Sequence, residues 1–163
     1  YHRLINSGVA LSKPFNDVVV RFEGAMLGGK HFQTSDSRLA TEKQSAKYLL
    51  GLDWYPGNNL TISGQLGNEQ YIFKHSDDLI AEQNNYLVTV NIQKKFLREK
   101  LELGNMFYYG FADNDFFERF SADYALTDNF HLAGGVDIFT GEQGYFGNYD
   151  KNDSFWIKAK YNF

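Results

Sequence analysis

The last eleven residues of the chain alternate without a break between two sets of side chains. One set is Phe155, Ile157, Ala159, Tyr161 and Phe163, and the other is Trp156, Lys158, Lys160 and Asn162. A period of two is typical of a β-strand, because successive side chains point to opposite faces. The sequence therefore predicts a final strand with one apolar and one polar face. A soluble protein gains little from ending on an exposed Phe, whereas a transmembrane β-barrel is apolar on its outside and wet inside.

The same alternation recurs along the rest of the chain. It is weak in residues 1–12 and clearer in 18–28, 47–54, 60–66, 86–93, 100–109, 116–126 and 130–139. Together with 153–163 these segments predict about nine strands of roughly ten residues, the length that a tilted membrane strand needs.

The predicted connections alternate between short and long. Short ones centre on Pro14, Pro56, Lys95 and Asp128, and long polar ones cover 30–45, 74–84 and 140–152, with a shorter link at 110–114. We expect the short turns to share one end of the sheet and the long loops the other. Both prolines are expected in turns and outside strands, where proline would remove a ladder hydrogen bond.

Composition limits the possible classes of protein. The chain has 163 residues, a net charge of −4, no cysteine and a mean hydropathy of −0.45. This length suits one domain covering residues 1–163. No window approaches the ~20 apolar residues of a membrane helix. Without cysteine, disulfides and thiolate chemistry are excluded. No signal-peptide pattern follows Tyr1. Because the chain has no basic stripe, no nucleic-acid partner is expected.

Aromatic residues make up 17% of the chain and gather at the ends of the predicted strands. Trp54, Tyr55, Phe96, Phe130, Tyr161 and Phe163 lie near the short turns, and Tyr71, Phe73, Tyr108, Tyr109, Phe111, Phe116 and Phe139 near the long loops. Two aromatic girdles, as found at the membrane interfaces of transmembrane barrels, would account for them.

The final strand resembles the assembly signal of Gram-negative outer-membrane β-barrels, with Tyr161 and Phe163 at the matching positions. Residues 141–147 also look like the C-terminal region of porin-like proteins. The resemblance implies an all-β, antiparallel, up-and-down transmembrane β-barrel in the bacterial outer membrane. It implies passive diffusion of small hydrophilic solutes, with the barrel-assembly machinery, membrane lipid and lipopolysaccharide as partners.

The polar side chains of the alternating segments are expected to line the lumen of such a barrel. They are Arg21, Glu23, Lys47, Asp53, Lys100, Glu102, Arg119, Asp123, Asp137, Lys158 and Lys160. In a wide barrel these mixed charges would line water, and in a narrow one they would pair and plug the bore. No enzymatic activity, catalytic residue, metal site or cofactor is predicted.

Four alternatives remain open at this stage. A soluble barrel or sandwich also alternates, and a small closed barrel could serve as a structural or adhesive protein without a pore. A hydrolase would need a triad, and His75, Ser76 and Asp77 are neighbours in one loop, which rarely gives triad geometry. Calcium could bind at Asp77–Asp78 or at 150–153, but both segments lack the ligand count of a dedicated loop.

Strand parity predicts that the barrel is incomplete. Nine strands place Tyr1 at the external end, whereas bacterial single-chain barrels have an even number of strands. We expect a further strand from a longer chain or from a neighbouring chain, for example in a homo-oligomer. In the alternative, residues 1–16 form a plug and 17–28 pairs with 153–163 to close eight strands. Asn105 and Glu118 fit neither the incomplete barrel nor the closed eight-stranded barrel, because the two-residue alternation puts both polar side chains on the apolar side of their strands.

Overall fold

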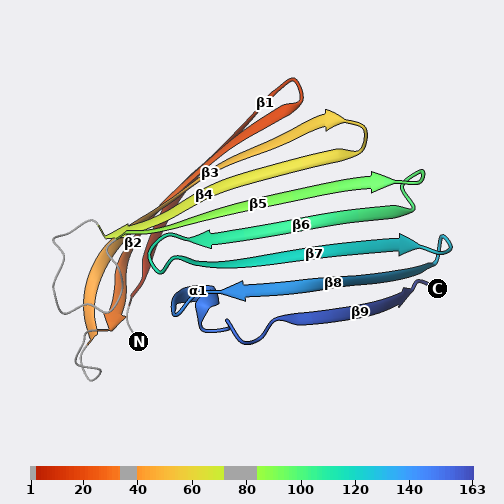
Figure 1. The fold of residues 1–163 in the computed structure, drawn as a ribbon. Helices are drawn as coiled ribbons and strands as arrows, with labels where there is room; N and C mark the ends of the chain where they lie inside the picture. Colours follow the sequence, from red (N-terminus) through yellow and green to blue (C-terminus); the bar gives the residue numbers. More distant parts are fainter. Residues whose placement is uncertain (1–2, 34–39, 72–83) are drawn as a thin grey trace.

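All the strands in the described part of the chain lie in one antiparallel sheet. The computed structural model describes residues 3–33, 40–71 and 84–163, and each strand pairs with its neighbours in sequence (Figure 1). The strands are β1 (Ile5–Phe15), β2 (Val18–Gln33), β3 (Ala40–Gly57), β4 (Leu60–Tyr71), β5 (Asn84–Phe96), β6 (Leu101–Gly110), β7 (Asp115–Ala125), β8 (Phe130–Thr140) and β9 (Ser154–Tyr161), with a short helix α1 (Gly144–Gly147) before β9. The all-β, up-and-down architecture and the nine strands predicted from the sequence are confirmed.

The sheet is not closed into a barrel. Within the described residues β1 pairs only with β2, and β9 only with β8, so the sheet has two free edges. The predicted closure of eight strands is wrong, because β2 pairs with β1 and β3 and not with β9. Residues 5–15 form a strand instead of a plug.

The two ends of the sheet differ, as predicted. The tight turns after β1, β3, β5 and β7 share one end with the end of β9, and α1 lies at the other end (Figure 1). Asn16, Asn58 and Asn59 adopt positive φ in two of these turns, a conformation that Asn tolerates better than most residues.

The loop predicted at 30–45 is much shorter than expected. β2 continues to Gln33 and β3 begins at Ala40, after a register shift between Leu27 and Lys30 in which Gly29 has a φ of 83°. A glycine bulge breaks the alternation of side chains without ending the strand. The sequence pattern therefore did not predict that the strand continues beyond residue 28. Most of the predicted loop at 74–84 lies outside the described residues.

Both prolines lie within strand bounds, contrary to prediction. Pro14 pairs with Val19 near the end of β1, which is an edge strand. Pro56 lies at the register shift between Trp54 and Gly57. An edge and a bulge are the places where a strand tolerates the missing N–H of proline.

The register places the large hydrophobic side chains of the strands on one face, which we call the apolar face. It includes Phe22, Leu50, Ile92, Leu103, Phe120, Leu132, Val136, Phe155 and Ile157, each at least a third exposed. The opposite face, the polar face, carries the charged residues discussed below. Because so much apolar surface is unusual on a water-exposed monomer, the apolar face needs an apolar environment or a partner.

Asn105 and Glu118 interrupt the apolar face, as counting predicted. Asn105 Nδ2 donates a hydrogen bond to Glu118 Oε1 at 2.9 Å, from β6 to β7. Their direct cross-strand neighbours are apolar: Phe107 opposes Glu118, and Phe120 opposes Asn105. The two polar side chains therefore satisfy each other where their surroundings offer few partners.

This pairing predicts strongly non-additive mutations. Asn105→Leu should lower the free energy of unfolding by about 1–3 kcal/mol, because it leaves the Glu118 carboxylate without its donor. The double variant Asn105→Leu/Glu118→Leu should recover much of that loss. Equilibrium unfolding in urea measures the cycle, and simple additivity of the two single changes would contradict the interpretation.

Candidate functional site: the polar face and its covering segment

The predicted lumen-lining residues share one face of the sheet, with one exception. Ten of them occupy polar-face positions by register: Arg21, Glu23, Lys47, Asp53, Glu102, Arg119, Asp123, Asp137, Lys158 and Lys160. Lys100 instead lies in the turn between β5 and β6 and precedes the first residue of β6. Lys100 continues the alternating pattern of β6 by one residue, but the strand itself begins only at Leu101.

Cross-strand ion pairs neutralise much of this charge. Arg21 binds Asp53 at 2.9 Å, and Lys47 binds Glu69 at 3.1 Å. Both pairs join β3 to a neighbouring strand. The Asp53 residue is largely shielded from solvent, with 9% of its surface exposed. Partly exposed pairs of this kind stabilise a protein by about 1 kcal/mol or less, so their main effect is to fix side-chain positions.

The most connected group on the polar face is centred on Arg119 and Asp137. Arg119 Nε and one terminal nitrogen bind the two oxygens of Asp137 at 2.6 and 2.5 Å, a bidentate arrangement between directly paired residues of β7 and β8. Trp156 Nε1 donates to Asp137 Oδ1 at 3.3 Å. The guanidinium carbon lies 5.5 Å from the Phe117 ring centre and 5.7 Å from that of Trp156. Bidentate geometry and aromatic neighbours hold this cluster more rigidly than the other pairs.

His131 belongs to the polar face although it was not predicted as a site residue. Its Nδ1 lies 2.8 Å from Asp123 Oδ1. Asp123 directly opposes Glu102 across β6 and β7, so two carboxylates face each other there. The His131 ring therefore lies beside a pair of facing carboxylates.

The connection between β8 and β9 folds onto the polar face through α1. The Phe146 ring lies 5.7 Å from Tyr108 and 5.9 Å from Phe117, and Phe117 lies 4.8 Å from Phe139. Tyr108 and Phe139 were predicted in an aromatic girdle, but the register places both on the polar face. They support α1 instead of facing outward. The sequence pattern could not show this, because α1 is too short to have a period.

Asp115 anchors α1 to the sheet. Its side chain is buried, and its Oδ2 accepts hydrogen bonds from the backbone N–H of Phe146 at 2.6 Å and of Gly147 at 3.3 Å. A Cβ at Gly144 would lie 2.6 Å from that oxygen, and Gly144 also has a φ of 93°. Glycine is therefore required for this close approach, which gives the glycine-rich segment 141–147 a physical role.

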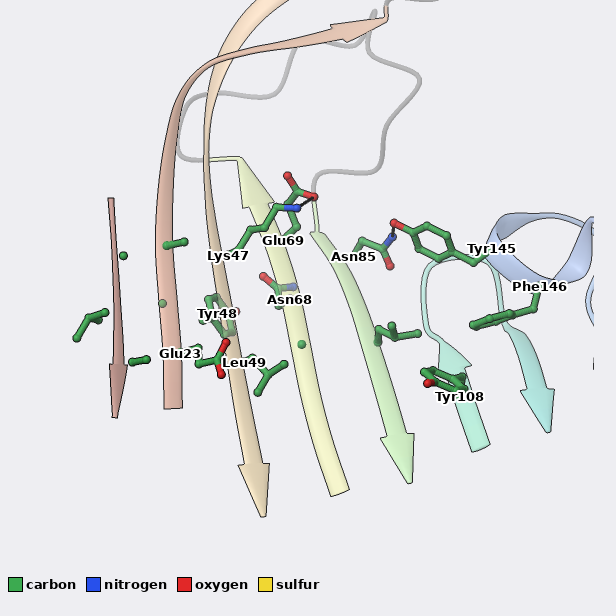
Figure 2. Close-up of a pocket in the computed structure, with 17 residues that line it drawn as sticks. Glu23, Lys47, Tyr48, Leu49, Asn68, Glu69, Asn85, Tyr108, Tyr145 and Phe146 are labelled. Atoms are coloured by element: carbon green, nitrogen blue, oxygen red, sulfur yellow. Dashed lines mark hydrogen bonds and ion pairs between the residues drawn. The ribbon is translucent and has the colours of Figure 1, made fainter. Parts of the chain in front are cut away.

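A cavity of about 860 Å³ lies between α1 and the first six strands. Tyr145 projects from α1 and accepts a hydrogen bond from Asn85 of β5 at 3.3 Å (Figure 2). The lining of the cavity combines eleven polar-face residues of β1 to β6 with Tyr145 and Phe146. Four further lining residues are on the apolar face by register: Val9, Gly24, Tyr48 and Asn68. Because eleven of the fifteen strand residues in the lining are on the polar face, the sheet is hollowed mainly on that face. We call this cavity the trough.

The catalytic and calcium alternatives gain no support. His75, Ser76, Asp77 and Asp78 lie outside the described residues. Asp153 accepts a hydrogen bond from the Phe139 backbone N–H at 2.8 Å, which gives it a structural role. In the described ranges no group of three or more His, Asp or Glu residues is placed to hold a metal ion. No helix in the same ranges is long and apolar enough to cross a membrane.

Comparisons with known proteins add no assignment. No family model, no curated protein and no solved structure matches the chain.

The anchor at Asp115 predicts local loosening when it is removed. Asp115→Ala should accelerate hydrogen exchange at the Phe146 and Gly147 amides by roughly 10–100-fold, because a hydrogen bond to a charged acceptor contributes about 1.5–3 kcal/mol. Asp150→Ala, in the same connection, is the control and should leave both amides protected. Equal protection in Asp115→Ala and the unmodified protein would show that α1 is held by its aromatic contacts alone.

Proposed function

We propose that the chain forms part of the wall of an outer-membrane, porin-like channel for passive diffusion of small hydrophilic solutes. The apolar face would contact lipid, and the polar face would line the aqueous path. This assignment rests on the sequence resemblance at Tyr161 and Phe163 and on the division of the sheet into two faces. The ion pairs of the polar face suit a water-filled lumen, where charged side chains remain hydrated and set selectivity.

The observation that carries the proposal is the direction of curvature. A soluble barrel or sandwich buries its apolar face inside, so its sheet would curve around the apolar side chains. Here the trough lies on the polar face, and the large hydrophobic side chains lie on the other side of the sheet. That arrangement favours an apolar surrounding and a polar interior.

The ends of the sheet agree with a membrane orientation. Four apolar-face residues lie near the strand ends at the tight turns: Trp54, Phe96, Phe130 and Tyr161. Tyr109 and Phe116 are paired apolar-face residues at the end that carries α1. Aromatic side chains at both ends of an apolar band are typical of the two membrane interfaces.

The free edges of β1 and β9 define what a closed channel would still need. In a membrane an unpaired edge is costly, because lipid offers no partner for its N–H and C=O groups. We therefore propose that further strands, from a longer chain or from a neighbouring chain, join these edges. The final number of strands would set the width of the bore.

Charge reversal on the polar face should change ion selectivity. Lys158→Glu/Lys160→Glu alters the proposed path by four charge units, so its cation-to-anion permeability ratio in planar lipid bilayers should rise severalfold. Lys13→Glu/Lys94→Glu makes the same change on the apolar face, beside Phe15 and Phe96, and should leave the ratio unchanged. Absence of conductance once further strands have closed both edges, or equal shifts in both variants, would refute the channel.

The terminal aromatics should be needed for assembly. Tyr161→Ser/Phe163→Ser should reduce the amount of folded protein in the outer membrane at least tenfold, because the proposed assembly signal is lost. Phe111→Ser/Tyr149→Ser removes two other exposed aromatics, at the opposite end of the sheet, and serves as the control. Membrane fractionation measures both, and normal levels of the first variant would remove the support that the resemblance provides.

A further inference from the structure

We propose that the trough is a binding site for neutral sugars of at least disaccharide size. This inference rests on the proposed channel function and names the solute class that the polar face would favour. It is carried by three features of the trough: its shape, its polar groups and its aromatic wall.

Small residues create the hollow. Polar-face positions of β1, β2 and β4 along its lining hold small residues where larger side chains would fill the space: Gly8, Ala10, Ala25 and Gly67. The resulting volume of about 860 Å³ lies in the range of pockets that take small organic ligands. It is large enough for more than one sugar ring.

The polar groups of the trough combine donors and acceptors. Glu23, Lys47, Glu69 and Asn85 reach it from β2, β3, β4 and β5, and Figure 2 shows the Lys47–Glu69 pair above the floor. Sugar hydroxyls both donate and accept hydrogen bonds, so a carboxylate, an ammonium and an amide together match them. A purely apolar ligand would instead strip water from these charged groups without replacing it.

Aromatic rings form the wall opposite the strand floor. The rings of Tyr145 and Phe146 lie 6.4 Å apart, and Phe146 packs against Tyr108 at 5.7 Å. Tyr145 is 61% exposed, and it presents a ring next to hydrogen-bonding groups. The C–H face of a sugar ring is apolar, so it can pack on such a ring while its hydroxyls reach the polar groups.

The charge of the trough selects against anions. Glu23 and Glu69 contribute two negative charges and Lys47 one positive charge, so the lining carries a net charge of −1. A phosphorylated sugar would meet repulsion that a neutral sugar does not. This distinguishes the proposed ligand from sugar phosphates and nucleotides of similar size.

The test uses the purified protein in detergent and four neutral disaccharides: maltose, sucrose, lactose and cellobiose. Isothermal titration calorimetry should detect binding of at least one of them, with glucose 6-phosphate bound at least tenfold more weakly. Tyr145→Ala should weaken sugar binding about fivefold to tenfold, whereas Tyr145→Phe, which keeps the ring and loses only the hydroxyl contact to Asn85, should keep most of the affinity. Tyr149→Ala changes an equally accessible tyrosine of the same connection that does not line the trough, and it should bind like the unmodified protein.

The outcomes separate this inference from the channel proposal. Conductance without binding of any of the four sugars, or an equal loss of binding in Tyr145→Ala and Tyr149→Ala, would overturn the sugar site and leave the channel standing. Sugar binding without conductance, once further strands have closed both edges, would support the site and refute the channel. Preference for glucose 6-phosphate would also overturn the inference, because it would show that the net charge of the trough does not govern selection.

Discussion

The division of the sheet into an apolar and a polar face depends on the pairing register, which must align the two-residue period of each strand with that of its neighbour. A slip of one residue in any pair would exchange the two faces of every strand beyond it. The register keeps Arg119 opposite Asp137 and Ala133 opposite Lys158, so charges from strands distant in sequence collect on one face. Tight turns fix this phase between strands, and the bidentate Arg119–Asp137 pair would be lost if β7 and β8 shifted by one residue.

The strands and their faces could be predicted from the sequence because alternation is a local property of each strand. Ten of the eleven predicted polar-face residues occupy that face, and the error at Lys100 arose where the chain leaves the strand. The extension of β2 was missed because the bulge around Gly29 shifts the phase of the pattern. The prolines were misplaced for a related reason: an edge and a bulge accept proline, but a sequence does not show which strand lies at an edge.

The parts that could not be predicted depend on contacts between distant segments. The sequence suggested that Asn105 and Glu118 were misplaced, yet their hydrogen bond across β6 and β7 explains both at once. In the same way, Asp115 showed no sign of a special role until the fold brought it to the backbone of Phe146 and Gly147. Tyr108 and Phe139 looked like girdle residues because their distance from the strand end is right, but a girdle also requires the outward face. A residue's distance from the strand end can be read from the sequence, but the face on which its side chain lies is fixed by the register of the paired strands.

The segment that folds over the polar face links the architecture to the proposed function. A sheet lined only by charged strands would offer hydrated charges and little else to a passing solute. The connection between β8 and β9 adds aromatic rings to that surface, held in place by Asp115 beneath α1 and by the Asn85 contact at its tip. Because both contacts are hydrogen bonds to fixed strands, the rings are positioned before a solute arrives, and little ordering entropy is lost on binding. In the proposed channel, a rigid aromatic wall facing a small-residue floor would convert one side of the polar face from a general aqueous surface into a site that discriminates between solutes.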